Sequence, residues 1–150
     1  MKLFFGFIAL AAMAADPAGF GQYTSKQFDD KSVELAGKLK SGLASDKLAD
    51  WGNHSIQAVR RENSGQAEFH EKQADVIIIR KGEGSMIVGG TVVNPNSPRP
   101  NEIVGDRIEG GETHPFKAGD IIHVPPKTAH QIILKKGQKI DYVAIKVDAQ

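Results

Sequence analysis

The sequence contains no cysteine among its 150 residues. This absence excludes a disulfide framework, a thiol nucleophile and any zinc or iron–sulfur site built on cysteine ligands. A metal ion bound by this chain must therefore be held by histidine, aspartate, glutamate or water. The absence fits an exported protein as well as a cytosolic one, and so it leaves the compartment open.

The chain also lacks an excess of charge of either sign. Lys and Arg number 19 against 18 Asp and Glu, which gives a formal net charge of +1. Because no strong positive field results, we expect no binding to nucleic acid. The sequence has no glycine-rich phosphate loop, serine nucleophile elbow, His-Glu-x-x-His helix or dinucleotide-binding fingerprint. These classes of enzyme are therefore not indicated.

Long apolar runs are absent apart from one at the start of the chain. Met1-Lys2 precede an apolar run from Leu3 to Ala12, and small residues follow at Ala14 and Ala15. This order is typical of a secretory signal peptide, and a run of about ten residues is too short to span a bilayer comfortably. The alternative is an ordinary N-terminal helix or strand. We predict that residues 1–15 are a signal peptide and that the protein is secreted or periplasmic, with no membrane attachment after cleavage.

The sequence after the predicted signal peptide divides into two parts. Residues 16–50 are expected to form an arm and one helix, which Ser25 or Asp29 would cap and which would run to about Lys40, with Ser41-Gly42 as its stop. We expect this helix to pack against the outside of a β-barrel formed by the rest of the chain, or against a partner subunit. A homodimer through residues 33–39 or through an edge strand is a further hypothesis.

Residues 51–147 are predicted to form a β-barrel, because 16 Gly and 7 Pro favour many turns between short strands. His54 to Arg61 is expected to be the first strand. The segment 94–101 contains three prolines and cannot hold a central strand. It is either a surface excursion or a lid in which Arg99 meets an anionic ligand. The other expected strands are 67–70, 76–80, 85–88, 91–93, 102–108, 113–116, 121–124, 129–134 and 139–147.

Two motifs in this part resemble those of the cupin family, G-x5-H-x-H-x3,4-E-x6-G and G-x5-P-x-G-x2-H-x3-N. In the second, Gly119, Pro125 and His130 fall at the family spacing, whereas Lys127 stands where glycine is usual and Leu134 where asparagine is usual. The first motif is degenerate, and the residues that correspond to it are Gly65, Glu68 in place of the first histidine, His70, Asp75 in place of the glutamate, and Gly82. The resemblance implies an all-β fold, an antiparallel double-stranded β-helix or jelly-roll cupin barrel, carrying one N-terminal α-helix.

Strand geometry places Glu68 and His70 on one face, since residues two apart in a strand point the same way. The resemblance implies that His70 and His130 are metal ligands, with Glu68 and Asp75 as further candidate ligands. Two imidazoles and a carboxylate suit Fe(II) and also accept Mn, Ni, Co or Zn. Aspartate is one methylene shorter than glutamate, so the Asp75 carboxylate could fall short of the metal. Glu71 and Gln73 in the intervening loop remain alternative ligands. His123 is expected to be a packing or hydrogen-bonded strand residue and His114 to lie at a strand edge, whereas His54 starts a strand and could reach a barrel mouth.

The leading functional hypothesis is a divalent-metal-dependent enzyme acting on a small organic substrate, of dioxygenase, isomerase or lyase type. The cofactor would be Fe, Mn, Ni or Zn, and Glu68 would transfer a proton as a catalytic residue if it is not a ligand. The alternative is a non-catalytic barrel that binds a small metabolite or sugar. Fold alone does not choose between the two.

Overall fold

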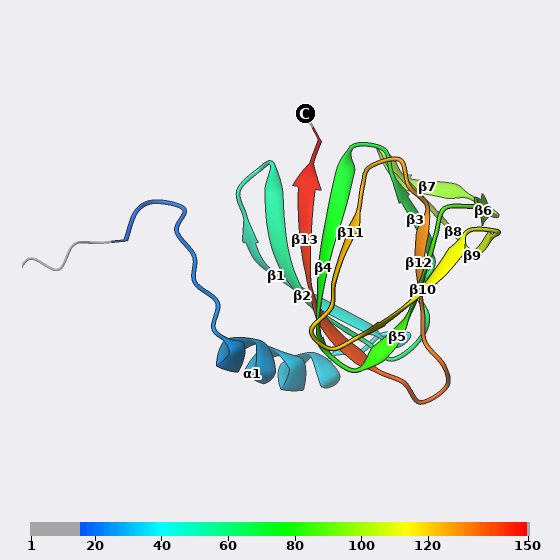
Figure 1. The fold of residues 1–150 in the computed structure, drawn as a ribbon. Coiled ribbons are helices and arrows are strands. Elements are labelled where there is room, and N and C mark those ends of the chain that lie inside the picture. The colour runs from blue at the N-terminus through cyan, green and yellow to red at the C-terminus, as the bar shows by residue number, and fades with distance from the viewer. Residues whose placement is uncertain (1–15, 150) are drawn as a thin grey trace, which may run out of the picture.

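The computed structural model describes residues 16–149, which form one helix and thirteen strands (Figure 1). The predicted signal peptide, residues 1–15, lies outside the described residues. The elements are α1 (Ser25–Ala36), β1 (Leu43–Asp50), β2 (His54–Arg61), β3 (Ala67–His70), β4 (Gln73–Lys81), β5 (Glu83–Val88), β6 (Thr91–Val93), β7 (Asn96–Arg99), β8 (Glu102–Gly105), β9 (Arg107–Glu109), β10 (Glu112–Lys117), β11 (Ile121–Val124), β12 (His130–Ile133) and β13 (Ile140–Asp148).

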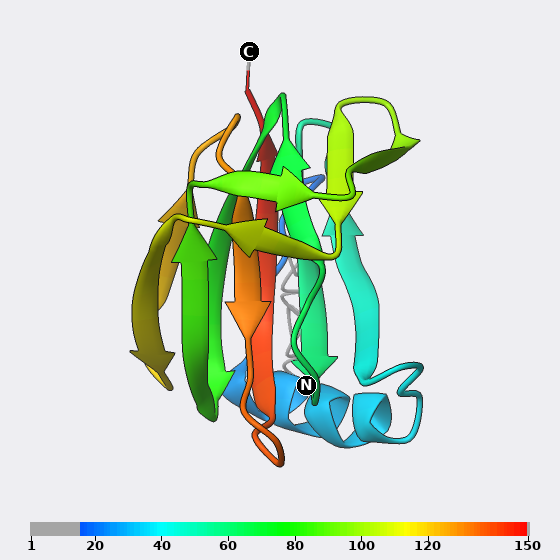
Figure 2. The same ribbon diagram turned by 90° about the vertical axis from the view of Figure 1, so that its right-hand side faces the viewer.

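Two antiparallel sheets face each other and enclose the interior of a barrel. One has the strand order β1-β2-β13-β4-β11 and the other β10-β5-β12-β3-β8-β7. A small third sheet, β6-β9, lies across the outside of the second sheet (Figure 2). This arrangement confirms the predicted antiparallel jelly-roll barrel with one N-terminal helix.

The apolar core fills one part of the space between the two sheets. Alternation along β4 buries Asp75, Ile77 and Ile79, as expected for a strand with one face inward. Ile77 and Ile79 join the main apolar cluster, whereas Asp75 lies beyond it toward the polar site described below. The other buried members of this cluster are Val59, Met86, Phe116, Val124, Ile132, Leu134, Ile140, Tyr142 and Ala144.

The prediction of the helix boundaries was wrong at both ends. Thr24 is the N-cap and forms a capping box with Gln27, so Ser25 is the first helical residue. The helix ends at Ala36, with Gly37 as its C-cap, instead of continuing to Lys40. Ser41 and Gly42 both have positive φ, and they form the turn that leads into a strand.

The strand expected to be first is in fact the second. β1 (Leu43–Asp50) pairs along its length with β2, so the barrel sheet begins within the segment expected to form only the arm and the helix. The sequence of β1, Leu-Ala-Ser-Asp-Lys-Leu-Ala-Asp, has no β-branched or aromatic residue. Such a strand forms because β2 provides a partner, which local propensity does not reveal.

The helix packs against the outside of the barrel, as predicted. Leu35 is buried against Ala44 of β1 and Ala58 of β2. Beside this contact, the Ser32 hydroxyl donates a hydrogen bond of 2.5 Å to Asp141, which also accepts from Arg60. No helix within residues 16–149 has both the length and the apolar character needed to cross a membrane.

The proline-rich segment adds a strand only at a sheet edge, consistent with the prediction that it holds no central strand. β7 (Asn96–Arg99) is the last strand of the six-stranded sheet. The single strand expected at 102–108 is divided into β8 and β9. The division falls at Asp106, directly after Gly105, where a Cβ atom would lie 2.4 Å from the Val93 carbonyl oxygen.

Candidate metal centre

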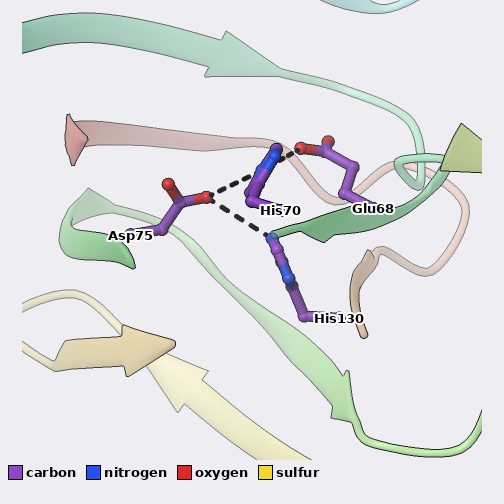
Figure 3. A group of neighbouring side chains, drawn as sticks. All are labelled: Glu68, His70, Asp75 and His130. Carbon is purple, nitrogen blue, oxygen red and sulfur yellow. Dashed lines mark ion pairs between the residues drawn. The ribbon is translucent and has the colours of Figure 1, made fainter. Parts of the chain in front are cut away.

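Four side chains named from the sequence converge inside the barrel (Figure 3). Potential ligand atoms of Glu68, His70, Asp75 and His130 all lie within 4.8 Å of one another. His70 Nε2 is 3.4 Å from Asp75 Oδ2 and 3.5 Å from Glu68 Oε2. His130 Nε2 is also 3.4 Å from Asp75 Oδ2. The carboxylate of Asp75 is thus shared by the two imidazoles.

The cluster is assembled from both main sheets. Glu68 and His70 are two residues apart on β3, and Glu68 is the register partner of His130 on β12. Asp75 comes from β4 in the facing sheet. His70, Asp75 and His130 are at most 6% exposed, whereas Glu68 is only half-buried. The aspartate therefore reaches the cluster despite its short side chain.

Backbone contacts fix the orientation of His130. Its Nδ1 lies 3.1 Å from the Thr128 carbonyl oxygen, which can only accept a hydrogen bond. In the neutral ring this contact places the proton on Nδ1, which leaves Nε2, the atom that faces the cluster, free to bind a metal. The turn before this strand is tied to β3, because the Lys127 amide donates to the His70 carbonyl at 2.7 Å.

Sequence reasoning missed Lys146 at this site. Its Nζ lies 2.9 Å and 3.1 Å from the two carboxylate oxygens of Asp75 and 3.4 Å from His70 Nε2. Lys146 is on β13, next to β4 in the sheet, and is the register partner of Asp75. Alternation along residues 139–147 could have placed Lys146 on the same face as Tyr142 and Ala144, but no spacing motif marks it.

Opposing effects set the charges of the cluster. Burial works against the charged form of His70, but the ion pairs with Asp75 and Glu68 outweigh it and raise the His70 pKa to about 9. Burial likewise opposes ionisation of Asp75, yet His130, His70 and Lys146 hold the Asp75 pKa well below its usual range. The same kind of balance lowers the pKa of Glu68, mainly through His70. Both carboxylates are therefore ionised near neutral pH.

The residues of the cluster fit a divalent ion in type and spacing. Nitrogen and carboxylate ligands lie about 2.0–2.2 Å from such an ion, so neighbouring ligand atoms are roughly 3–4 Å apart. The separations of 3.4 and 3.5 Å fall in that range. The Lys146 ammonium opposes a metal, since it already neutralises the Asp75 carboxylate, and so does the proton that His70 holds near neutral pH.

The cluster borders a cavity of about 630 Å³ inside the barrel. Glu68, Asp75, His130 and Lys146 line one part of it, and Arg61 is among its other lining residues. A second hollow of about 690 Å³ adjoins it, bordered by His70, Lys146 and Arg99 together with residues of several strand ends. Arg99 is mostly exposed and pairs with Glu102, so it lies at the edge of this space.

The remaining candidates do not join the cluster. His54, His114 and His123 are exposed, and His54 stacks on Trp51 with ring centroids 4.8 Å apart. Glu71 is exposed, and Gln73 donates a hydrogen bond to Asp148. The two loop residues kept as alternatives are therefore not part of the assembled site.

Comparison with solved structures identifies what the fold resembles. A variant of Streptomyces PAC13 with uridine matches with a TM-score of 0.53 and 17% identity, covering 75% of this chain and 74% of that chain. A cupin 2 conserved barrel domain protein from Salinispora arenicola matches with a TM-score of 0.51 and 17% identity, covering 74% of this chain and 80% of that chain. The polyketide cyclase RemF from Streptomyces resistomycificus matches with a TM-score of 0.50 and 14% identity, covering 73% of this chain and 67% of that chain. No family model matches the sequence, and no curated protein matches it significantly.

Proposed function

We propose that this chain, which has the cupin fold, is a divalent-metal-dependent enzyme acting on a small organic substrate inside its barrel. The observation that carries the proposal is the convergence of two imidazoles and two carboxylates at the wall of a cavity. Such a ligand set suits Fe(II), Mn, Ni or Zn. The structural neighbours include a cyclase and a protein with bound uridine, which supports small-molecule chemistry in this fold.

The division of roles follows from burial. His70, Asp75 and His130 are deeply buried and would hold the ion, which would supply Lewis-acid activation of a substrate oxygen. Glu68 is half-buried, lines the cavity and is ionised near neutral pH, so its carboxylate can accept a proton from a bound substrate. Lys146 pairs with Asp75 and lines the cavity, so its positive charge can stabilise negative charge on a bound substrate. The reaction would be of dioxygenase, isomerase or lyase type.

The experiment is elemental analysis of the untagged protein after reconstitution with Fe, Mn, Ni and Zn in turn. We expect near-stoichiometric metal in the wild type, and loss of it in His70→Ala and in His130→Ala. His123→Ala is the matched control, because this exposed histidine lies outside the cluster and its loss should leave the metal content unchanged. A folded wild-type protein that takes up none of the four ions would contradict the proposal.

A second function, a non-catalytic barrel that binds a small metabolite, is favoured by Lys146. Its ammonium group is 2.9 Å from Asp75 Oδ1 and already supplies the positive charge that a metal would bring. Replacing Lys146 with Met distinguishes the two functions. A resident metal should bind more tightly in the variant because a competing cation is gone. A protein that uses Lys146 in place of a metal should remain without one and lose stability.

We propose that the protein is exported, on the basis of residues 1–15 alone. Expression of the full chain in a bacterial host should give a mature protein whose N-terminus follows Ala14 or Ala15, recovered from the periplasm or the medium. Mass spectrometry of the intact protein measures this. Recovery from the cytoplasm with Met1 to Ala15 still attached would contradict the proposal.

A further inference from the structure

Arg61 is a buried arginine that points into the barrel. It is the last residue of β2, on the same face as Val59 and Gln57, and it is only 8% exposed. Its neighbour Arg60 points the other way, where it pairs with Glu62 and Asp141 on the outside of the sheet. The two adjacent arginines therefore have opposite surroundings, and of the two only Arg60 has acidic partners among residues 16–149.

The charge of Arg61 is not neutralised by the described part of the chain. Within residues 16–149, no carboxylate forms an ion pair with its guanidinium, and Nε has no hydrogen-bond partner. Its polar neighbour is the Tyr142 hydroxyl, which carries no charge. A buried charge without a partner is strongly unfavourable, so a chain that retains one gains from an anion at that place.

The cavity connects Arg61 with the candidate metal centre. The same space of about 630 Å³ is lined by Arg61 and Tyr142 and by Glu68, Asp75 and His130. Tyr142 and Lys146 are four residues apart on β13, which corresponds to about 13 Å along the strand. A small organic molecule can bridge such a distance. Its body would contact apolar residues that line the cavity, among them Val59, Ile77, Ile132 and Ala144.

Gly65 provides the room that the guanidinium occupies. A Cβ atom at this position would lie 2.9 Å from Nη1 and 3.1 Å from Cζ of Arg61. The guanidinium therefore lies directly against the glycine backbone, and any larger residue would displace it. This contact gives Gly65, the glycine that corresponds to the first motif, a specific role in holding Arg61 at the cavity wall.

We propose that Arg61 and Tyr142 bind a carboxylate group of the substrate, with the rest of the molecule extending through the cavity toward the metal centre. The assignment rests on the proposed function, since it names the class of substrate: a small organic acid with an apolar body. A planar guanidinium with a hydroxyl beside it matches the two oxygens of a carboxylate. A phosphate group has more oxygens to satisfy, and the other cations lining this cavity, Arg99 and Lys146, are already paired.

The test measures the affinity of the protein for phenylacetate, its neutral analogue phenylacetamide, and phenyl phosphate by calorimetric titration. The full-length mature protein is treated with a chelator beforehand, so that binding to a metal makes no contribution. A failure of the metal proposal would thus leave this result unaffected. We expect the wild type to bind phenylacetate at least about tenfold more tightly than phenylacetamide, because the amide offers no charge to Arg61.

The variant Arg61→Gln should lose this preference for the carboxylate. Arg80→Gln is the matched control, because Arg80 is an arginine of the outer face that lies over the Phe28 ring. It should keep the preference. If Arg61→Gln does not fold, Gly65→Ala replaces it, since the added methyl group displaces the guanidinium and should weaken phenylacetate binding selectively.

Three results would overturn the assignment. The first is a wild type that shows no preference for phenylacetate over phenylacetamide or binds neither at millimolar concentration. The second is an unchanged preference in a folded Arg61→Gln variant, which would leave Arg61 with a structural role only. The third is tighter binding of phenyl phosphate than of phenylacetate, which would assign the site to phosphate esters.

Discussion

Lys127 shows how one residue can depart from a family motif and still adopt its backbone conformation. It stands where the second cupin motif usually has glycine, and its φ is +60°, in the left-handed region that favours glycine. The amide of Lys127 donates a hydrogen bond to the His70 carbonyl, so this conformation is held by β3, the strand that carries His70. The chain has therefore retained the turn at the cost of some strain.

Replacing Lys127 with glycine should stabilise the protein. Relief of the left-handed conformation is worth about 1–2 kcal/mol, and the greater freedom of glycine in the unfolded chain offsets part of it. We expect a net gain of about 0.5–1 kcal/mol in the free energy of unfolding, measured by urea denaturation. Lys127→Ala keeps the strain and should give no gain. An equal gain in both variants would show that the lysine side chain is the cause.

His70 should give the candidate metal centre a pH dependence. In the metal-free protein its pKa is raised to about 9, mainly because Asp75 and Glu68 outweigh the effect of burial. A metal binds only the neutral imidazole, so below that pKa each metal ion must displace a proton. The pKa values of both carboxylates are lowered, so these groups stay ionised and add no dependence in this range.

The apparent affinity for Zn or Mn should accordingly rise with pH. Between about pH 6 and pH 8 we expect roughly a hundredfold increase, since one proton is displaced per ion. Competition against a chromophoric chelator measures the change, with the chelator's own protonation taken into account. The same affinity throughout this interval would contradict the prediction that the metal ion displaces a proton from His70.

At the scale of elements, the helix is fixed to the barrel by one face. Leu35 is 1% exposed against the outer surface of β1 and β2, whereas Val33 on the same helix is 76% exposed. Leu35→Ala should lower the free energy of unfolding by about 2–4 kcal/mol, because it removes a fully buried side chain and leaves a cavity. Urea denaturation measures this.

Val33→Ala is the matched control for the helix and should change stability by no more than about 0.5 kcal/mol. A large loss in this variant would show that Val33 is buried in solution. It would then support the predicted homodimer through residues 33–39, which light scattering of the two variants can check.

Strands with strong local signals were predictable, and those that depend on a partner were not. The boundaries of β2, β3, β6 and β11 agree with the sequence prediction residue for residue, because turn residues stand at their ends. β1 was missed, since its residues have low β-propensity and it forms by pairing with β2. The break between β8 and β9 depends on a backbone approach at Gly105, which comes from tertiary packing.

The same distinction holds for the site at the scale of the whole molecule. His130 was predictable because it lies at the family spacing after Gly119 and Pro125, and His70 because it corresponds to the second histidine of the degenerate first motif. Lys146 and Arg61 carry no such spacing, and they reach the cavity only because β13 and β2 present one face to the interior. From sequence alone, a positively charged residue within a strand is expected to face solvent, so the inward orientation of these two residues becomes evident only when the sheets are assembled.

The candidate metal centre joins the two main sheets of the barrel. Glu68, His70 and His130 come from the six-stranded sheet, and Asp75 comes from the five-stranded sheet. These ligands converge only in the folded state, so binding of an ion should stabilise the fold as a whole. At a free metal concentration a hundredfold above Kd, the expected stabilisation is about 2.7 kcal/mol.

For a domain of this size that stabilisation corresponds to a rise in Tm of roughly 10 °C. Thermal unfolding with and without the best-bound ion measures the shift, and a chelator should reverse it. His130→Ala should remove the shift while His123→Ala retains it, because only His130 belongs to the cluster. If His130→Ala showed the same rise as the wild type, the ion would be stabilising the protein from another place, and the centre between the sheets would not be its site.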